Sequence, residues 1–298
     1  RSNSTAAPVS LNAGELAYSS DSNKLFVGHP QSAAVTTIGG AVYVNMLDHT
    51  AGTLTASSAV LVDANSKIDQ LKSGNTVITG SNNTIEAIEF TKHAEEFKAD
   101  AVLVVTPYYN KPTQAGIVEH FRAIAEVDDL PVVIYNVPSR TGSNILPETV
   151  LSLAHIPGVV AVKESSGSLI QAMEIINNRP QAFRVLSGDD WAALPVILMG
   201  GDGVVSVAAN LVPDRIHKMV EAALAGEMVL ARSLHYSLLP LMKANFIETN
   251  PIPVKAILSM MGLITESYRL PLVPISPENR MRLKQVAEDT GLTLKAEV

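Results

Sequence analysis

The chain of 298 residues contains no cysteine. This absence excludes thiol nucleophiles, thiolate metal sites and disulfides together, and it suits a reducing compartment. The sequence also has no apolar run of about 18 residues and no charged segment followed by a short apolar stretch, so we expect neither a membrane span nor a signal peptide. We therefore expect a soluble, cytoplasmic protein.

Basic residues are in deficit. The 22 lysines and arginines against 29 aspartates and glutamates give a formal net charge of -7 and leave no electrostatic footprint for nucleic acid or an anionic membrane surface. The seven histidines are scattered without the short spacing of metal ligands. What is present is a 47% hydrophobic chain, long enough for one barrel or two ordinary domains.

The composition changes near residue 74. Serine and threonine number 17 in residues 1–74 and 26 in residues 75–298, whereas charged residues number 9 and 42. Such a shift is typical of a domain boundary. We expect a divergent, β-rich segment at 1–74, barrel units at 75–225 and a helical domain at 226–298.

Residues 1–74 carry short β-prone runs separated by turn-forming residues. The runs are 15–18, 24–27, 41–44 and 59–62. They predict an array of hairpins. Residues 14–28 also resemble, over a short stretch, the β-repeats of tailed-phage fibre and neck proteins.

From residue 75 onward the pattern predicts alternating strands and helices. Strands are expected at 76–80, 101–105, 131–135, 159–163, 183–187 and 203–207, and helices after Asn83 and at 115–127, 147–155, 169–177, 190–199 and from Pro213. We expect Asn83 to cap its helix with a return bond from Glu86. One helical face should hold Ile85, Ile88, Thr91, Ala94 and Phe97. Further helices are expected at 230–247, 251–262 and 277–290.

Polar residues gather at or just after the carboxyl ends of these strands. They are Tyr108, Tyr109, Tyr135, Asn136, Lys163, Glu164, Ser187 to Asp190 and Ser206. In a β/α barrel those ends converge on one rim, where active sites lie. The predicted fold class is therefore α/β, a (β/α)8 TIM barrel, rather than an open doubly wound sheet.

Lys163 ends an otherwise apolar strand, so burial should lower its pKa and make the amine a candidate for Schiff-base formation. The alternative is a lysine that reaches solvent or pairs with Glu164. Tyr135 ends the preceding strand and could shuttle protons, although it could equally be a buried tyrosine with a satisfied hydroxyl. Arg140 is suited to holding a carboxylate, or is simply a solvated loop charge.

Six motifs stand in order along the chain. They are Thr106 to Pro112 (TPYYNKP), Tyr135 to Gly142 (YNVPSRTG), Val162 to Gly167 (VKESSG), Leu186 to Asp190 (LSGDD), Gly200 to Ser206 (GGDGVVS) and Asn250 to Lys255 (NPIPVK). Together they resemble the dihydrodipicolinate synthase family, one of the pyruvate-dependent class I aldolases that also include N-acetylneuraminate lyase. The resemblance covers about residues 75–298.

The resemblance implies a lyase of lysine biosynthesis that condenses pyruvate with aspartate semialdehyde. It assigns the Schiff base to Lys163, the proton relay to Tyr135 and to a Tyr109 lent across a dimer interface, and the aldehyde substrate's carboxylate to Arg140. It places Gly188 and Val205 in the pyruvate pocket. Asn82, Glu86 and Tyr108 match positions that bind the inhibitor lysine in some members. It further implies a homodimer or homotetramer with neither metal nor organic cofactor, the pyruvate imine on Lys163 being the only covalent group.

One family feature is missing. The resemblance implies two βα units before residue 76, with a Gly-Thr-Thr-Gly-Glu loop in the relay, and the nearest lookalike, Thr36 to Gly40, is displaced and lacks the acidic residue. Three explanations are open. Residues 1–74 could still contribute two strands and close the barrel with reduced or altered activity, or they could be a phage-derived replacement that leaves a non-catalytic structural protein. The apparent fusion could also be an artefact of sequence assembly. A sialic acid or sugar-acid lyase is a further alternative, which Arg140 makes the weaker one.

Overall fold

The structure is a computed structural model that describes residues 75–127 and 129–295 and four short strands nearer the N-terminus. The chain divides into two compact units. The first consists of Arg1–Leu61 with Lys72–Gly74, and the second of Val62–Leu71 with Asn75–Val298. Residues 75–225 and 226–298 thus belong to one unit, while the division into three domains set out above remains a prediction.

In the first unit, three strands form an antiparallel sheet in the order β1 (Leu16–Ser19), β2 (Lys24–Gly28) and β3 (Val35–Gly39). The hairpin expected from runs 15–18 and 24–27 is confirmed. Strand β3 was not predicted, and it contains the Thr36 and Thr37 of the lookalike motif. The runs expected at 41–44 and 59–62 lie outside the described residues.

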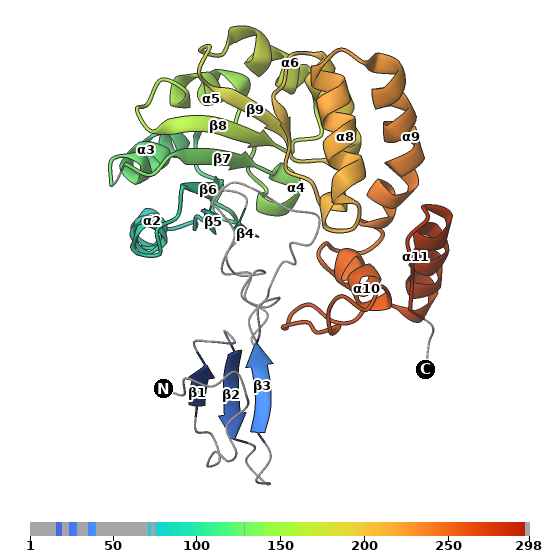
Figure 1. Ribbon diagram of the computed structural model, residues 1–298. Coiled ribbons are helices and arrows are strands. Elements are labelled where there is room, and N and C mark those ends of the chain that lie inside the picture. The colour runs from blue at the N-terminus through green and yellow to red at the C-terminus, as the bar shows by residue number, and fades with distance from the viewer. Residues whose placement is uncertain are drawn as a thin grey trace. The chain divides into compact units, whose positions relative to one another are not determined.

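A second sheet has seven strands that follow one another in chain order, and its strands β5 to β10 belong to the second unit (Figure 1). They are β4 (Leu71–Lys72), β5 (Asn75–Thr79), β6 (Ala101–Val105), β7 (Val132–Asn136), β8 (Val159–Glu164), β9 (Arg184–Ser187) and β10 (Gly203–Val204). Each neighbouring pair from β5 to β10 is parallel. Strict chain order in a parallel sheet is the arrangement of a β/α barrel, not of a doubly wound sheet.

A helix follows each of the strands β5 to β10 and packs outside the sheet (Figure 1). The long helices are α2 (Thr84–Glu96), α3 (Gln114–Ala125), α5 (Pro147–Leu153), α6 (Leu169–Asn178), α7 (Ala193–Leu198) and α8 (Pro213–Leu224). The six predicted βα units are confirmed. The helix expected at 190–199 begins with the 3-10 turn η1 (Asp190–Ala192) and continues as α7. The short helix α4 (Pro138–Thr141) and the 3-10 turn η2 (Ala208–Asn210) were not predicted.

Helix α2 shows where the helical-face prediction was wrong. Asn83 caps it as expected, accepting from the N–H of Ile85 at 3.0 Å, but Glu86 bonds to the hydroxyl of Ser81 and not back to Asn83. Ile85 and Phe97 are 69% and 58% exposed, and the buried face is Ala87, Thr91 and Ala94. Three residues fall about 60° short of one full turn of an α-helix. Each further step of three therefore moves the side chain around the helix, so that Ile85 and Phe97 lie off the face that Thr91 occupies.

The apolar core between the sheet and its helices follows the two-residue period of the strands. Val102 and Val104 of β6 and Val132 and Ile134 of β7 are fully buried against the helices, where Phe121 of α3 packs with them. The intervening residues therefore face the other way, into the barrel. This alternation fixes which side chains can enter a site inside it.

The C-terminal helices are α9 (Met228–Ala244), α10 (Ile252–Met260) and α11 (Pro277–Asp289), close to the predicted ranges. Their apolar faces share a second core with α8 and η2 that includes Met219, Leu238, Leu241, Ile257 and Leu283.

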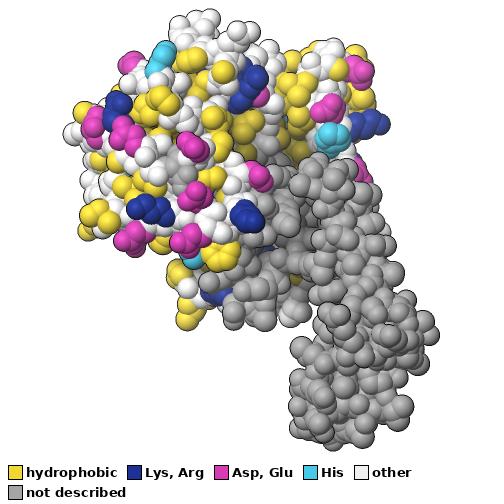
Figure 2. Space-filling view, turned by 60° about the vertical axis from the view of Figure 1, so that its left-hand side comes forward, with side chains coloured by type: hydrophobic (Ala, Val, Ile, Leu, Met, Phe, Trp, Pro, Cys, Tyr) yellow, Lys and Arg dark blue, Asp and Glu magenta, His cyan; other side chains and the backbone are white. Residues whose placement is uncertain are grey.

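Charged side chains of both signs are interspersed on the face seen in Figure 2. None of the helices in the described ranges is long and apolar enough to cross a membrane.

Candidate active site

Strand pairing brings Lys163 and Tyr135 together. Val105 pairs with Tyr135, Tyr135 with Lys163, Lys163 with Leu186, and Leu186 with Gly203, so these residues form one rung across five strands. Residues of one rung point to the same face, which here is the barrel interior near the carboxyl ends of the strands. The Nζ atom of Lys163 lies 3.8 Å from the centre of the Tyr135 ring.

The environment of Lys163 favours its neutral form. Burial lowers the pKa of Lys163 to about 8, the negative Asp189 opposes this change, and the positive Arg140 adds to it. The alternative that Lys163 pairs with Glu164 is not supported. Adjacent residues of a strand point to opposite faces, and the Glu164 carboxylate accepts bonds from Asn136 and Gln171 instead.

Tyr135 is held from the backbone and keeps its proton. Its carbonyl oxygen accepts bonds from both the N–H and the hydroxyl of the buried Thr106, at 3.0 and 2.8 Å. Burial raises the pKa of Tyr135, and the nearby Arg140 acts in the opposite direction. A neutral phenol beside an amine can donate a proton to, or accept one from, a reacting oxygen.

Arg140 lies on helix α4, which the left-handed Gly142 (φ 73°) ends. Its side chain is exposed and donates to the carbonyl of Asn250 at 3.3 Å. Its charge acts on the pKa of both Lys163 and Tyr135, which places the guanidinium on the same rim. Among the described residues no carboxylate forms an ion pair with it, so its donors can take one from a ligand.

Gly188 and Val205 follow the ends of β9 and β10. The N–H of Gly188 bonds to the carbonyl of Glu164, and the N–H of Val205 to that of Ser187, both at 2.8 Å. A Cβ at Gly188 would lie 1.7 Å from the Ser165 hydroxyl and 3.1 Å from the Cε of Lys163. The absence of a side chain at Gly188 therefore leaves space for the Ser165 hydroxyl first and for the Lys163 side chain beside it.

Tyr109 is placed apart from this cluster. Its side chain is 86% exposed, its φ is 71°, and its N–H bonds to the carbonyl of Thr141 at 3.2 Å. Within the described residues no ring contact joins it to Tyr135 or Lys163. Its catalytic role stays a prediction.

The three residues matched to an inhibitor site lie on two adjacent loops. The carbonyl of Asn82 accepts a bond from the side chain of Asn110 at 2.9 Å, which joins the loop after β5 to the loop after β6. Tyr108 is 41% exposed on the second loop. Glu86 is bonded to Ser81, and no contact between Glu86 and Tyr108 is found in this part of the structure. Their shared role also stays a prediction.

Three polar residues of the site were not assigned from the sequence. Burial raises the pKa of both Asp189 and Asp190, and the charge of each acts on Lys163. Ser165 is buried beside Gly188 and Lys163. The sequence signal was their position just after a strand end, but that position alone does not tell which side chains turn toward the lysine.

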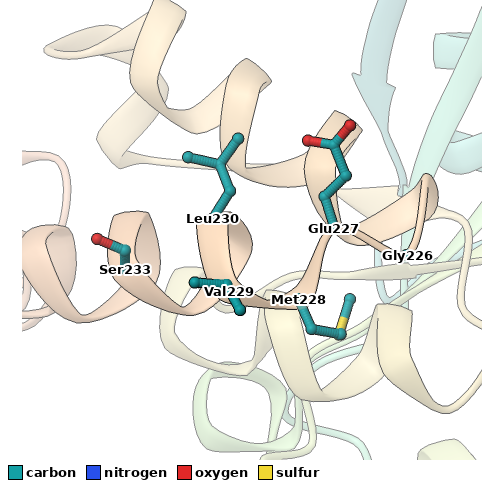
Figure 3. Close-up of a pocket in the computed structure, with 6 residues that line it drawn as sticks. All are labelled: Gly226, Glu227, Met228, Val229, Leu230 and Ser233. Atoms are coloured by element: carbon teal, nitrogen blue, oxygen red, sulfur yellow. The ribbon is translucent and has the colours of Figure 1, made fainter.

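The hollow at the start of α9 lacks this chemistry. An open hollow of about 630 Å³ at the start of α9 is lined by Gly226 to Leu230 and Ser233, and the only titratable side chain among them is Glu227 (Figure 3). Across the described ranges, no cluster of three or more histidine, aspartate or glutamate side chains could hold a metal ion. The cluster around Lys163 is thus the candidate site.

Comparison with known proteins shows to which family the chain belongs. The family model described as the dihydrodipicolinate synthetase family matches residues 70–290. The chain belongs to this family. It is 53% identical over 219 residues to a 4-hydroxy-tetrahydrodipicolinate synthase of Koribacter versatilis, covering 73% of each chain.

Solved structures of the family superpose on the chain. The dihydrodipicolinate synthase of Aquifex aeolicus matches with a TM-score of 0.73 and 45% identity, over 74% of this chain and 76% of that one. The enzyme of Acinetobacter baumannii complexed with pyruvate gives 0.72 and 42%, over 73% and 75%. The enzyme of Cyanidioschyzon merolae with lysine bound gives 0.71 and 42%, over 73% and 74%.

Membership of the dihydrodipicolinate synthetase family confirms several predictions. The α/β barrel of the TIM type with C-terminal helices is the fold of these relatives, and a class I aldolase-type lyase is the predicted kind of enzyme. The synthase activity named for the relatives is the one predicted from the six motifs. The interpretation as a non-catalytic structural protein is therefore less well supported than the interpretation as a synthase.

Proposed function

We propose that the chain condenses pyruvate with aspartate semialdehyde, the reaction of a 4-hydroxy-tetrahydrodipicolinate synthase in lysine biosynthesis. The observation that carries the proposal is the amine of Lys163, with a pKa of about 8, set against the phenol of Tyr135 inside the barrel. About a tenth of an amine with such a pKa is neutral at pH 7, far more than of free lysine, and the neutral form can attack a ketone.

The chemistry follows from these two groups. The Lys163 amine adds to the carbonyl carbon of pyruvate, and loss of water leaves an imine. Loss of a methyl proton gives an enamine, whose carbon attacks the aldehyde carbon of the second substrate while the aldehyde oxygen gains a proton. Attack of that substrate's amine on the imine carbon then closes the ring and frees Lys163. In each proton transfer Tyr135 is the donor or acceptor.

The remaining residues take supporting roles in this proposal. Arg140 binds the carboxylate of aspartate semialdehyde, and its exposed guanidinium, which forms no ion pair among the described residues, supports that role. Gly188 and Val205 line the pyruvate pocket beside Lys163. Tyr109, 86% exposed, enters the relay of a second copy in a homodimer or homotetramer.

Regulation by lysine is part of the same proposal. Asn82, Glu86 and Tyr108 are its candidate residues, on loops joined by the bond from Asn110 to Asn82. The proposal includes no metal or organic cofactor, nucleic acid or membrane partner, and it places the enzyme in the cytoplasm.

The sequence lacks the Gly-Thr-Thr-Gly-Glu loop that the family uses for its relay and for the pyruvate carboxylate. We therefore propose a turnover below that of the relatives, limited by pyruvate binding and proton transfer. Residues 1–74 either supply a substitute or leave the enzyme impaired. The alternative of a sugar-acid lyase would need cleavage of a longer substrate.

Borohydride trapping tests the proposal. The full chain is incubated with pyruvate, reduced and analysed by mass spectrometry, and the expected result is a gain of one pyruvate less one water plus two hydrogens, on Lys163. Lys163→Met is the control and should show no gain. A folded protein without any adduct would refute the proposal. Turnover of aspartate semialdehyde, compared with that of N-acetylneuraminate, then decides between the two lyases.

A further inference from the structure

Behind the catalytic rung, β8 turns a second charged side chain the other way. Glu164 is 6% exposed, and its Oε1 accepts from the N–H of Ser166 at 2.6 Å. Its Oε2 accepts from the side-chain amides of Asn136 at 3.0 Å and Gln171 at 3.1 Å. Within the described residues no cation pairs with it, so this buried charge is held by hydrogen bonds.

The partners of Glu164 also hold the loop that carries Arg140, which connects β7 to α5. Asn136 precedes the loop, and its side-chain oxygen accepts from the N–H of Ile145, nine residues on, at 3.0 Å. Its amide nitrogen donates to Asn144 at 3.0 Å as well as to Glu164. One fully buried side chain thus closes the base of the loop.

Gln171, on helix α6 of the next βα unit, forms hydrogen bonds to the C-terminal end of the same loop. Its amide nitrogen donates to the carbonyl of Ile145 at 3.1 Å, and its oxygen accepts from the side chain of Asn144 at 3.0 Å. Glu164 receives the third bond. The loop is therefore tied at both ends to β8 and α6 by groups buried among one another.

Arg140 depends on this anchorage because its own side chain has little else to hold it. The guanidinium is exposed, and its one described hydrogen bond, to Asn250, is long at 3.3 Å. Helix α4, on which it sits, is a single turn of four residues. A shift of the loop base would move the guanidinium relative to Lys163, and misplacement by about 1 Å can cost about a hundredfold in rate.

We propose that Glu164 and Gln171 are positioning residues that set the place of Arg140 through Asn136 and the loop base, and so govern use of the second substrate but not of pyruvate. The proposal rests on the function proposed above. It predicts a separation of the two half-reactions that a purely structural role would not give.

Gln171→Met tests it, because methionine is close in volume to glutamine but makes none of these bonds. The expected result is a rise of about tenfold or more in the KM for aspartate semialdehyde, as for loss of hydrogen bonds to a charged group. The rate of the pyruvate adduct on Lys163 should stay within about twofold. Gln285→Met, on the exposed face of α11, is the matched control and should change neither.

A second comparison separates positioning from general damage. In an Arg140→Ala background, Gln171→Met should have no further effect on KM, because the group it positions is gone. Glu164→Gln, which keeps the shape of the side chain, should act as Gln171→Met does, and thermal unfolding verifies that each variant is folded. A slowing of adduct formation as large as the rise in KM, or a rise in KM that persists without Arg140, would overturn the proposal. Absence of a pyruvate adduct in the unaltered chain would overturn both it and the proposed function.

Discussion

The ammonium of Lys163 lies 3.8 Å from the centre of the Tyr135 ring, on neighbouring parallel strands that pair these two residues directly. The ring face stabilises the charged amine, whereas burial destabilises it. Burial prevails, since the pKa of Lys163 is lowered to about 8. The amine of Lys163 therefore gains and loses its proton within about one pH unit of neutrality.

The first prediction concerns pH. The rate of pyruvate adduct formation should rise with pH through a midpoint near 8, because only the neutral amine of Lys163 attacks. Borohydride trapping at a series of pH values measures it. Asp189→Asn should lower the midpoint, since the negative charge that it removes raises the pKa of Lys163, and Arg140→Ala should raise the midpoint because the positive charge that it removes lowers this pKa. A midpoint near that of free lysine, about 10.4, would contradict the assignment.

A second prediction is that Lys163→Met stabilises the fold. Lowering the pKa of Lys163 from 10.5 to about 8 costs the folded state at most about 3 kcal/mol at neutral pH. The unfolded chain binds this proton more tightly, so the wild type gains stability as pH rises from 8 to 10.5 and the advantage of the variant shrinks. Urea unfolding at pH values on both sides of 8 measures it.

Lys92→Met, at an exposed position of α2, is the control for this substitution and should change stability little. Equal gains from both variants would mean that hydrophobic replacement alone, and not removal of the buried charge, is responsible.

The third prediction uses Gly188. Gly188→Ala should abolish adduct formation, because the new Cβ would lie 1.7 Å from the Ser165 hydroxyl and 3.1 Å from Lys163 Cε. The double variant with Ser165→Ala removes the closest contact and should restore part of the rate. Gly116→Ala, which meets only ordinary contacts at 3.5 Å in α3, serves as the control. Normal trapping by Gly188→Ala would show that the site is wider than described.

The fourth prediction concerns acid stability. Burial lowers the pKa of His120 to about 4, and its Nδ1 lies 2.9 Å from the Thr84 hydroxyl, which links α3 to α2. The unfolded state therefore binds more protons between pH 6.5 and about 4, and stability falls as the pH drops through this range. His120→Gln should flatten this loss by roughly 2 kcal/mol, measured by urea unfolding near pH 7 and pH 5. The exposed His217→Gln should leave it unchanged.

Much of the fold was predictable because local patterns carry it. Buried parallel strands read as short apolar runs, and the helices α8 and α11 begin at the prolines that mark their first turns. The error at α2 arose because a three-residue spacing was extended over four successive steps, from Ile85 to Phe97. Strand β3 and helix α4 were missed since neither has an apolar period of its own.

The candidate site was predictable in part for the same reason. Lys163 and Tyr135 stand at strand ends, and strand order alone brings them together. Ser165, Asp189 and Asp190 follow strand ends too, but only the path of each loop decides which of them approach the amine.

The sequence by itself determined the βα alternation, the family motifs and the identity of the lysine, because these depend on residue type and spacing along the chain. Tertiary structure alone decided how far burial lowers the pKa of Lys163 and that Glu164, its neighbour in sequence, faces away from it. It also decided that Gln171 and Asn136 together hold the loop of Arg140. Desolvation and hydrogen-bond partners depend on distances between distant segments, which spacing along the chain does not contain.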